Sequence, residues 1–326
     1  MRRFHTLAIA ALMPAVIVVG GCSTRSLPAS SPFRATSSNV DQVGLSGDQA
    51  KVPARLYVAQ GSVGVLVYKQ FGVNQSPIKT ITSGLSRPEG LFVNTNGDLY
   101  VANLTGENVS VFKRGASVPY KTLNDPNEVA GSPVVDTDGT VYVCNYEGDS
   151  GGTLGPPGNV AVYSGGATNP TSTLPAPNGD WILWCALDSA HNLYVGYTDN
   201  ATHSNVEEFV GGSGTGTLLH LKIGFPGQMQ FNAKGNLVIA DERNYVVDTF
   251  KLPRTTPIGK IKAPVSGPPI VGMALNARST HLYMGDYSSG QIYEFSYPKG
   301  TLIDTISPVG GANDIEGLAT DPSAPL

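Results

Sequence analysis

One four-residue phrase recurs six times along this chain, each time as an aliphatic residue, a tyrosine or valine, another apolar residue and a small residue. The copies are residues 56–59 (LYVA), 99–102 (LYVA), 141–144 (VYVC), 193–196 (LYVG), 237–240 (LVIA) and 282–285 (LYMG). Successive copies begin 42 to 52 residues apart. This period is typical of β-propellers, in which each repeat folds into a blade of four strands.

The residues around each phrase predict the other three strands of a blade. An apolar segment precedes the phrase and ends in a turn, as in residues 90–98, where Gly97 can take the positive φ that a tight hairpin requires. A segment with alternating β-formers follows the phrase, for example residues 109–112, and then a more polar one, such as residues 119–123. That polarity suits the outer edge of a blade, where charge discourages pairing with another molecule.

The two ends of the repeat region predict how the ring closes. Residues 315–321 repeat the first strand of a blade and so begin a seventh, incomplete repeat, whereas the first blade starts at Leu56 without such a strand. We therefore expect the C-terminal strand to complete the first blade, which gives one all-β domain over residues 54–326, a propeller of six four-stranded antiparallel blades. The alternative is an open array or two separate sheets, which would expose strand edges at both ends.

The segment ahead of the repeats predicts export. Arg2 and Arg3 precede an apolar run over residues 7–19, which is too short for the roughly 20-residue helix that crosses a bilayer. Residues 19–22 (VGGC) resemble the bacterial lipobox, which implies a lipoprotein signal peptide at residues 1–21 and acylation of Cys22. Residues 22–53, rich in serine, proline and alanine, are interpreted as a flexible tether. The expected product is anchored to a membrane and faces the periplasm or cell exterior; the alternative is an ordinary secretory signal with an incidental cysteine.

The net charge of the chain argues against one class of partner. The formal net charge is −4, and removal of Arg2 and Arg3 with the signal peptide makes it −6. A chain of this charge without a basic run is a poor nucleic-acid binder.

Cys144 and Cys185 lie in apolar strands of neighbouring blades, where free cysteine packs as a small hydrophobe. We expect two buried thiols, with a disulfide as the alternative in an exported protein.

The repeat resembles the NHL family and, more loosely, the six-bladed gluconolactonase and senescence-marker family. Residues 88–103 (PEGLFVNTNGDLYVAN) and 108–112 (NVSVF) carry the NHL pattern best. The resemblance covers residues 56–326 and implies a six-bladed propeller. It does not select an activity, because such propellers include protein-binding scaffolds, lactone hydrolases and lyases.

Propeller geometry indicates where a site would lie. The start of each inner strand, the end of each second strand and the loops attached there share one face of the ring. The inner strands are expected to start at Glu89, Gly131, Leu183, Gly227, Val271 and Glu316, and the second strands to end at Gln60, Asn103, Asn145, Tyr197, Asp241 and Asp286. Glu89 and Glu316 fall in neighbouring blades, and most of the second strands end in a residue with a side-chain oxygen. Several oxygen donors should therefore converge at this face.

Gluconolactonase-like enzymes hold one divalent cation in this funnel with Glu, Asn and Asp, and the ion acts on a lactone carbonyl. The resemblance implies a Ca²⁺ or Zn²⁺ site at Glu89 and Glu316, whose following glycines echo the acid–glycine dipeptide of these enzymes. The further candidates are Asn103, Asn145, Asp241 and Asp286. No asparagine ligand stands out among Asn103, Asn127, Asn145, Asn178 and Asn313. The alternative is that acids and amides at strand ends cap the amides of their loops.

Two long irregular segments, residues 146–158 and 175–184, fall on the same face. The second contains Trp181 and Trp184, which suit stacking on a ligand if exposed and otherwise pack between blades. Among the histidines only His203 should reach this face, which argues against a histidine-based lyase or lactonase. We therefore expect a lipid-anchored binding or scaffold propeller for a protein partner or a sugar-like small molecule. A metal-dependent lactone hydrolase is the alternative.

Overall fold

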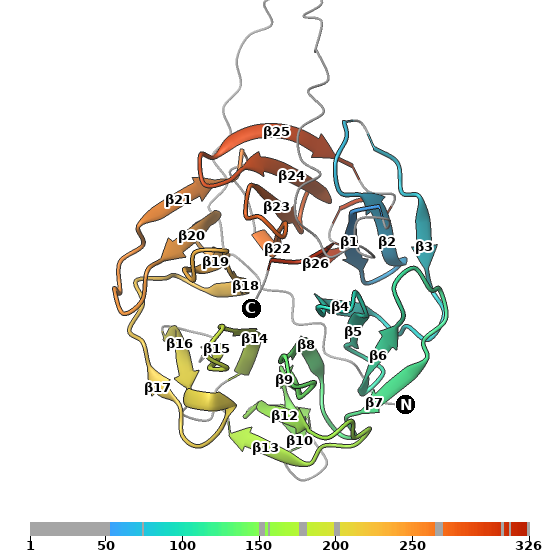
Figure 1. Ribbon diagram of the computed structural model, residues 1–326, viewed down its shortest axis with the longest axis vertical. Coiled ribbons are helices and arrows are strands. Elements are labelled where there is room, and N and C mark those ends of the chain that lie inside the picture. Colours follow the sequence, from blue (N-terminus) through green and yellow to red (C-terminus); the bar gives the residue numbers. More distant parts are fainter. Residues whose placement is uncertain are drawn as a thin grey trace, which may run out of the picture. The chain divides into compact units, whose positions relative to one another are not determined.

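The computed structural model describes residues 53–73, 75–149, 154–155, 157–175, 181–198, 203–264, 270–307, 310–312 and 314–324. This part of the chain forms six four-stranded antiparallel sheets around a common axis (Figure 1), so the predicted all-β, six-bladed fold is confirmed. The expected signal peptide, Cys22 and nearly all of the tether lie outside the described residues. Within the described residues no helix is long and apolar enough to cross a membrane.

Each blade runs from an inner strand near the axis to an outer strand at the rim (Figure 1). Blade 1 comprises β26 (Ile315–Asp321), β1 (Arg55–Gln60), β2 (Gly64–Lys69) and β3 (Lys79–Ile81), and blade 2 comprises β4 (Pro88–Val93), β5 (Leu99–Asn103), β6 (Asn108–Phe112) and β7 (Lys121–Asn124). Blade 3 comprises β8 (Ala130–Val135), β9 (Val141–Asn145), β12 (Asn159–Tyr163) and β13 (Ser172–Pro175), and blade 4 comprises β14 (Trp181–Leu187), β15 (Leu193–Thr198), β16 (Ser204–Phe209) and β17 (Thr217–Leu218). Blade 5 comprises β18 (Pro226–Phe231), β19 (Leu237–Asp241), β20 (Val246–Phe250) and β21 (Gly259–Lys262), and blade 6 comprises β22 (Ile270–Leu275), β23 (His281–Asp286), β24 (Gln291–Ser296) and β25 (Thr301–Ile306). A short hairpin of β10 (Gly148–Asp149) and β11 (Leu154–Gly155) follows β9, and the 3-10 turn η3 (Val210–Gly212) follows β16.

The last strand of the chain closes the ring. β26 pairs antiparallel with β1, with Leu56 opposite Thr320 and Val58 opposite Leu318. It also packs against the inner strands on both sides, β4 and β22. The prediction that the C-terminal strand completes the first blade is therefore confirmed.

The ladder between inner and second strand is interrupted at the same point in all six blades. Each interruption directly follows one equivalent pair, and these pairs are Ile315–Gln60, Pro88–Asn103, Ala130–Asn145, Ile182–Tyr197, Pro226–Asp241 and Ile270–Asp286. The first residue of each bulge is therefore Glu316, Glu89, Gly131, Leu183, Gly227 or Val271, the set that the sequence aligned. Because a β-bulge bends a strand and redirects its side chains, this end of the channel departs from regular sheet geometry.

Glycine inside the bulges lets neighbouring inner strands approach each other. A Cβ atom on Gly90 would lie 2.2 Å from the carbonyl oxygen of Gly131, and one on Gly317 would lie 2.4 Å from the carbonyl oxygen of Glu89. Both distances are well below van der Waals contact, so a larger residue would force the strands apart. The glycine of each acid–glycine dipeptide thus has a packing role.

The hydrophobic core lies between the blades and explains the repeated phrase. Successive side chains of a strand point to opposite faces of its sheet. In blade 1, Tyr57 packs toward blade 2 with Leu91, whereas Leu56 packs toward blade 6 with Tyr283. Each phrase therefore supplies apolar side chains to both neighbouring interfaces at once.

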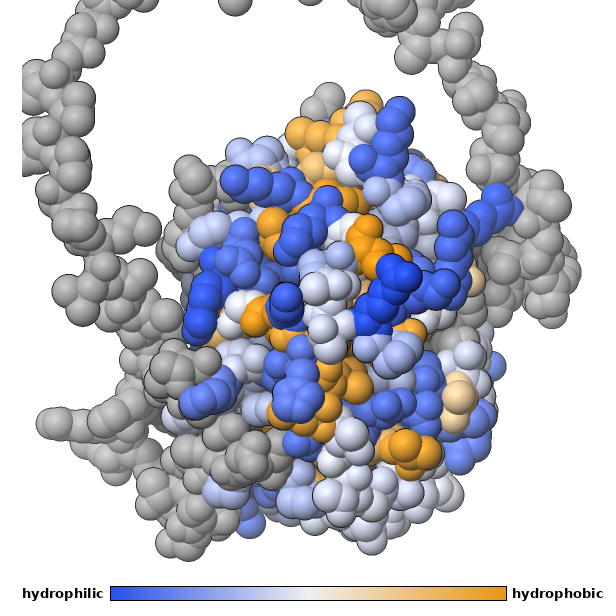
Figure 2. Space-filling model, turned by 90° about the vertical axis from the view of Figure 1, so that its left-hand side faces the viewer, coloured by the Kyte–Doolittle hydropathy of each residue, from blue (hydrophilic) through white to orange (hydrophobic). Residues whose placement is uncertain are grey.

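The rim of the ring is more polar. Every residue of β21 except Ile261 is exposed, and most of β25 is exposed or half-buried. Figure 2 shows one side of the ring, on which hydrophobic residues form small patches between hydrophilic ones. This agrees with the expected polarity of the fourth strands.

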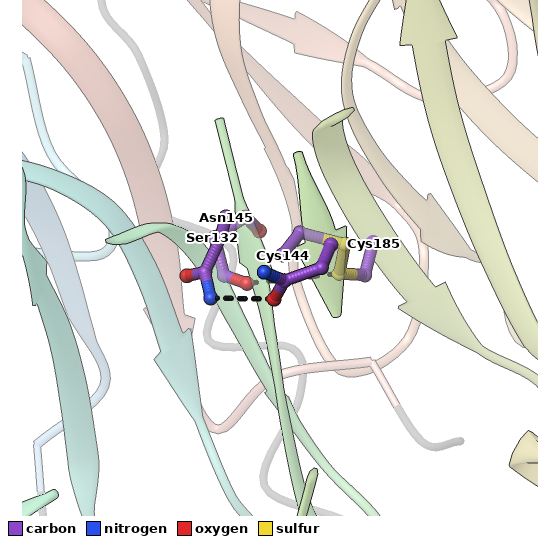
Figure 3. Close-up of a disulfide and its surroundings, with 5 residues drawn as sticks. Ser132, Cys144, Asn145 and Cys185 are labelled. Carbon is purple, nitrogen blue, oxygen red and sulfur yellow. Dashed lines mark hydrogen bonds between the residues drawn. A yellow bond between two sulfur atoms is a disulfide. The ribbon is translucent and has the colours of Figure 1, made fainter. Parts of the chain in front are cut away.

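The expectation of two free thiols is wrong. Cys144 on β9 and Cys185 on β14 form a disulfide between blades 3 and 4, with Cα atoms 6.1 Å apart (Figure 3). Both residues are buried, as expected. The bond depends on the packing of β14 against β9 across the blade interface, which neither strand's own pattern reveals.

Candidate functional site

The bulged ends of the inner strands surround one end of the central channel, here termed the channel mouth. Glu89 on β4 and Glu316 on β26 lie at this end on adjacent inner strands, as the sequence predicted. Their carboxyl groups are close enough for the charge of Glu316 to raise the pKa of Glu89. The two predicted acids therefore share one environment.

A third carboxylate, that of Glu242, joins this pair, and the sequence analysis missed it. Glu242 directly follows Asp241, the last residue of β19. Its Oε1 lies 2.8 Å from the position that a Cβ atom on Gly227 would take, so the carboxyl occupies the space beside the glycine bulge of blade 5. The sequence feature that could have revealed it is the pair of consecutive acids, Asp241 and Glu242, after the repeated phrase at residues 237–240. It was missed because we considered only the last residue of the second strand.

Burial and mutual repulsion favour protonation of these acids. Burial raises the pKa of Glu89 well above its ordinary value, and Glu316 adds to the effect. Burial followed by the charge of Glu316 raises the pKa of Glu242 to about 8. Burial also raises the pKa of Glu316, although the Arg87 guanidinium opposes the shift. The cluster therefore carries less than its full negative charge near neutral pH unless a cation relieves the repulsion.

Arg87 and two tyrosines border the acids. The Cγ of Arg87 and the Oε1 of Glu316 lie 3.3 and 3.6 Å from the position of a Cβ atom on Gly61, so the two side chains approach the same point. Burial raises the pKa of Tyr146 and of Tyr287, and neighbouring carboxylates of the mouth add to both shifts. The mouth thus combines three carboxylates, one guanidinium and two phenols.

Three of the predicted ligand candidates cap their own loops instead. Asn103, Asp241 and Asp286 are buried, and each accepts a hydrogen bond from a backbone amide of an adjacent loop. These bonds join Ser86 N to Asn103 Oδ1 (3.0 Å), Gly224 N to Asp241 Oδ2 (2.9 Å) and Ser288 N to Asp286 Oδ1 (3.0 Å). Their geometry matches the alternative interpretation, in which residues at strand ends cap loop amides.

The metal-ligand set implied by the family resemblance combines Glu with Asn and Asp. In the part of the chain that the structure describes, no three His, Cys, Asp or Glu side chains lie close enough together to hold a metal ion. Asn178 and Asn313, two of the asparagines considered, lie outside the described residues. What the described mouth offers is carboxylates facing a guanidinium, a set suited to binding polar groups.

Asn145 differs from the three capping residues. Its Nδ2 donates to Oδ1 of Asn159 at 3.0 Å. Its own Oδ1 is buried and has no hydrogen-bond partner. Figure 3 shows Asn145 beside Cys144 at the end of β9.

The two tryptophans have different environments. Trp184 is 4% exposed and packs between blades 4 and 5 with Met229 and Phe250, so it is not available for stacking on a ligand. Trp181 is half-buried, and its Nε1 donates to Oε1 of Glu147 at 3.3 Å. This bond connects the start of β14 to the segment after β9. His203 is exposed directly ahead of β16.

Gln228 bridges the channel below the mouth. Its Nε2 donates to the carbonyl oxygen of Leu318 at 2.7 Å, and its Oε1 accepts from the amides of Met273 and Leu318, both at 3.0 Å. These bonds connect β18 with β22 and with β26, which is not its neighbour in the ring.

Comparisons with known proteins identify the fold. No family model matches the sequence, and no curated protein matches it. The structure is similar to a chain in a crystal structure of a nidogen/laminin complex, with a TM-score of 0.63, 13% identity and coverage of 82% of this chain and 98% of that chain. It is also similar to a protein of unknown function from Bacteroides caccae, with a TM-score of 0.58, 14% identity and coverage of 82% and 99%. At these identities the likeness extends to the fold alone.

Proposed function

We propose that this chain is an exported, lipid-anchored, NHL-like propeller that binds a partner through its channel mouth, and that the mouth recognises a cationic group. The observation that carries the proposal concerns the hydrogen bonding of Glu89, Glu242 and Glu316. None of the three carboxylates accepts a hydrogen bond within the described part of the chain, unlike the capping residues around them. They are the acidic groups that a ligand would meet at the mouth.

A cationic ligand fits the electrostatics of this cluster. Three carboxylates with raised pKa values repel one another, and a guanidinium or ammonium would relieve that repulsion. The charge of Arg87 already opposes the pKa shifts of Glu316 and Glu89, and a second cation would relieve the repulsion that remains, above all at Glu242. Charge-assisted hydrogen bonds of this kind are among the stronger polar contacts in proteins.

Binding is favoured over metal-dependent hydrolysis by the fate of the other oxygen donors. Of the four further candidates for the Glu, Asn and Asp set of the gluconolactonase-like enzymes, Asn103, Asp241 and Asp286 are occupied by loop amides, which leaves only the Oδ1 of Asn145 without a partner. The similar propeller in the nidogen/laminin structure belongs to a protein complex, which makes a protein partner a reasonable expectation. The hydrolase remains the second candidate because Glu89 and Glu316 do lie together.

Export rests on two features. The N-terminal pattern that ends at Cys22 supports a lipid anchor. The Cys144–Cys185 disulfide supports an oxidising compartment, because such bonds persist mainly in exported proteins.

Calorimetric titration with matched peptides tests the proposal. An arginine-containing peptide should bind, and the same peptide with neutral citrulline in place of arginine should bind at least about tenfold more weakly, as expected for the loss of a charged hydrogen bond. The variant E89Q/E242Q/E316Q should lose this preference. The variant D138N, which changes an exposed acid on the opposite face, should keep it. Equal affinity for both peptides would refute cation recognition, and lactone hydrolysis dependent on Ca²⁺ or Zn²⁺ would favour the hydrolase.

A further inference from the structure

A second group of polar side chains lies away from the mouth cluster, in the connection between blades 2 and 3. Asp125 follows the end of β7 and is completely buried. Neither Oδ1 nor Oδ2 of its carboxyl has a hydrogen-bond partner. A buried carboxylate in this state is costly, because it has lost its water without a well-formed hydrogen bond in its place.

Three side chains surround this carboxyl. Burial raises the pKa of Asp125 to about 7; the Glu128 charge adds to the shift, whereas the polar groups of Tyr163 and Asn145 oppose it. Asn145 is also completely buried, and its Oδ1 is a further acceptor without a partner. The site therefore contains the carboxyl of Asp125, a second carboxyl from Glu128 and an amide oxygen.

The hydrogen-bond donors of these neighbours are engaged elsewhere. The Tyr163 hydroxyl donates to the carbonyl oxygen of Asn124 at 2.8 Å. Asn145 Nδ2 donates to Asn159 Oδ1 at 3.0 Å, and Asn159 Nδ2 donates to Glu128 Oε1 at 2.7 Å. This chain of bonds also fixes the orientation of the Asn145 amide, so that its oxygen is left as the acceptor. The site is rich in oxygen atoms and short of protons to bind them.

We propose that Asp125, Asn145 and Glu128 bind a hard divalent cation, and that Ca²⁺ suits them best. One divalent ion balances the charges of the buried Asp125 and the half-buried Glu128, which offsets the cost of burying the Asp125 carboxylate. It also supplies a partner for both oxygens of Asp125 and for Oδ1 of Asn145. Ca²⁺ accepts carboxylate and amide oxygens in irregular geometries, whereas Mg²⁺ demands a near-octahedral set and gives up its waters reluctantly.

This cation would join blade 2 to blade 3. Asp125 and Glu128 belong to the connection between the blades, whereas Asn145 belongs to the second strand of blade 3. Asn145 was also a candidate ligand for the metal centre implied by the gluconolactonase resemblance, but that centre would be built on Glu89 and Glu316, whereas this site is built on Asp125 and Glu128. It is independent of the proposed function, because none of its residues belongs to the mouth cluster.

Thermal unfolding of the full-length protein after chelation provides the first test. Addition of Ca²⁺ at about a hundredfold excess over its dissociation constant should raise Tm by roughly 5 °C. Mg²⁺ at the same concentration should have a smaller effect. Tb³⁺, a luminescent substitute for Ca²⁺, should show emission sensitised by the neighbouring Tyr163, and Ca²⁺ should displace it.

Two variants locate the ion. D125N should abolish the Ca²⁺ shift and the Tb³⁺ emission, and E89Q/E316Q, the matched control at the mouth, should keep both. If D125N does not fold, the Tb³⁺ signal and Ca²⁺ shift of E89Q/E316Q still decide between the sites. Loss of both signals in E89Q/E316Q would place the cation at the mouth and overturn the proposal. An unchanged Tm of the chelated wild-type protein in Ca²⁺ would overturn it as well, and would indicate a proton on Asp125.

Discussion

Reduction of the Cys144–Cys185 bond should lower the melting temperature of the propeller substantially. The bond connects residues 41 positions apart and joins two blades that also meet through side-chain packing and through the polar contacts of Trp181 with Glu147 and of His191 with Asp136. In the chain-entropy model a loop of this length stabilises the folded state by about 4 kcal/mol, because the cross-link restricts the unfolded chain. A change of 1 kcal/mol shifts Tm by roughly 2 °C in a domain of this size, so the expected loss is about 8 °C.

Differential scanning calorimetry with and without a reducing agent measures this loss. The C22S variant is the suitable background, since Cys144 and Cys185 are then its only cysteines. The variant C144A/C185A should melt low in both conditions and should not respond to the reductant. Thiol titration of the unfolded, unreduced protein should find no free thiol. Two free thiols in that titration, or an unchanged Tm after both are released, would refute the reasoning.

Three further changes test other parts of the molecule. C22S should block acylation and leave a precursor or a water-soluble protein on detergent phase separation; identical processing of wild type and variant to a soluble product would contradict the lipoprotein proposal. Gly317→Val should lower Tm by several degrees, since even a Cβ there would lie 2.4 Å from the Glu89 carbonyl oxygen, and an equal Tm would show that the inner strands can separate freely. Stability should fall as pH rises from about 4.5 to about 8, because folded Glu242, with its pKa raised to about 8, holds a proton that the unfolded chain releases. Glu242→Gln should flatten the chemical-denaturation profile across this pH window, and an unaltered slope would mean that Glu242 is not the group responsible.

The architecture was predictable because it depends on patterns that repeat locally. Alternation of apolar residues fixes the register of each strand, since a slip by one residue would move its buried side chains to the wrong face. The alignment of Glu89 with Glu316 followed from this register, and the pairs Pro88–Asn103 and Ile315–Gln60 confirm it. Closure by residues 315–321 was predictable for a similar reason. The first repeat lacked an inner strand, and the last repeat consisted almost entirely of one.

The chemical roles of individual polar residues were less predictable. Glu89 and Glu316 were correctly placed at the channel mouth, but Asn103 and Asp241 proved to cap loops. Both outcomes start from the same feature, an oxygen-bearing residue at the end of a strand. What separates them is whether an adjacent loop amide turns toward that oxygen, and that depends on loop conformation.

The sequence by itself therefore determined the blades, their number, their order and the face on which acids gather, because each of these follows from contacts within one repeat or from counting repeats. Only the tertiary structure decided which side chains meet across blades: Glu242 with Glu316, Cys144 with Cys185, and the oxygens of Asp125 with their neighbours in blade 3. Such contacts depend on the angle and spacing between successive sheets. Those quantities are set by the packing of all six blades around the ring, and no single repeat encodes them.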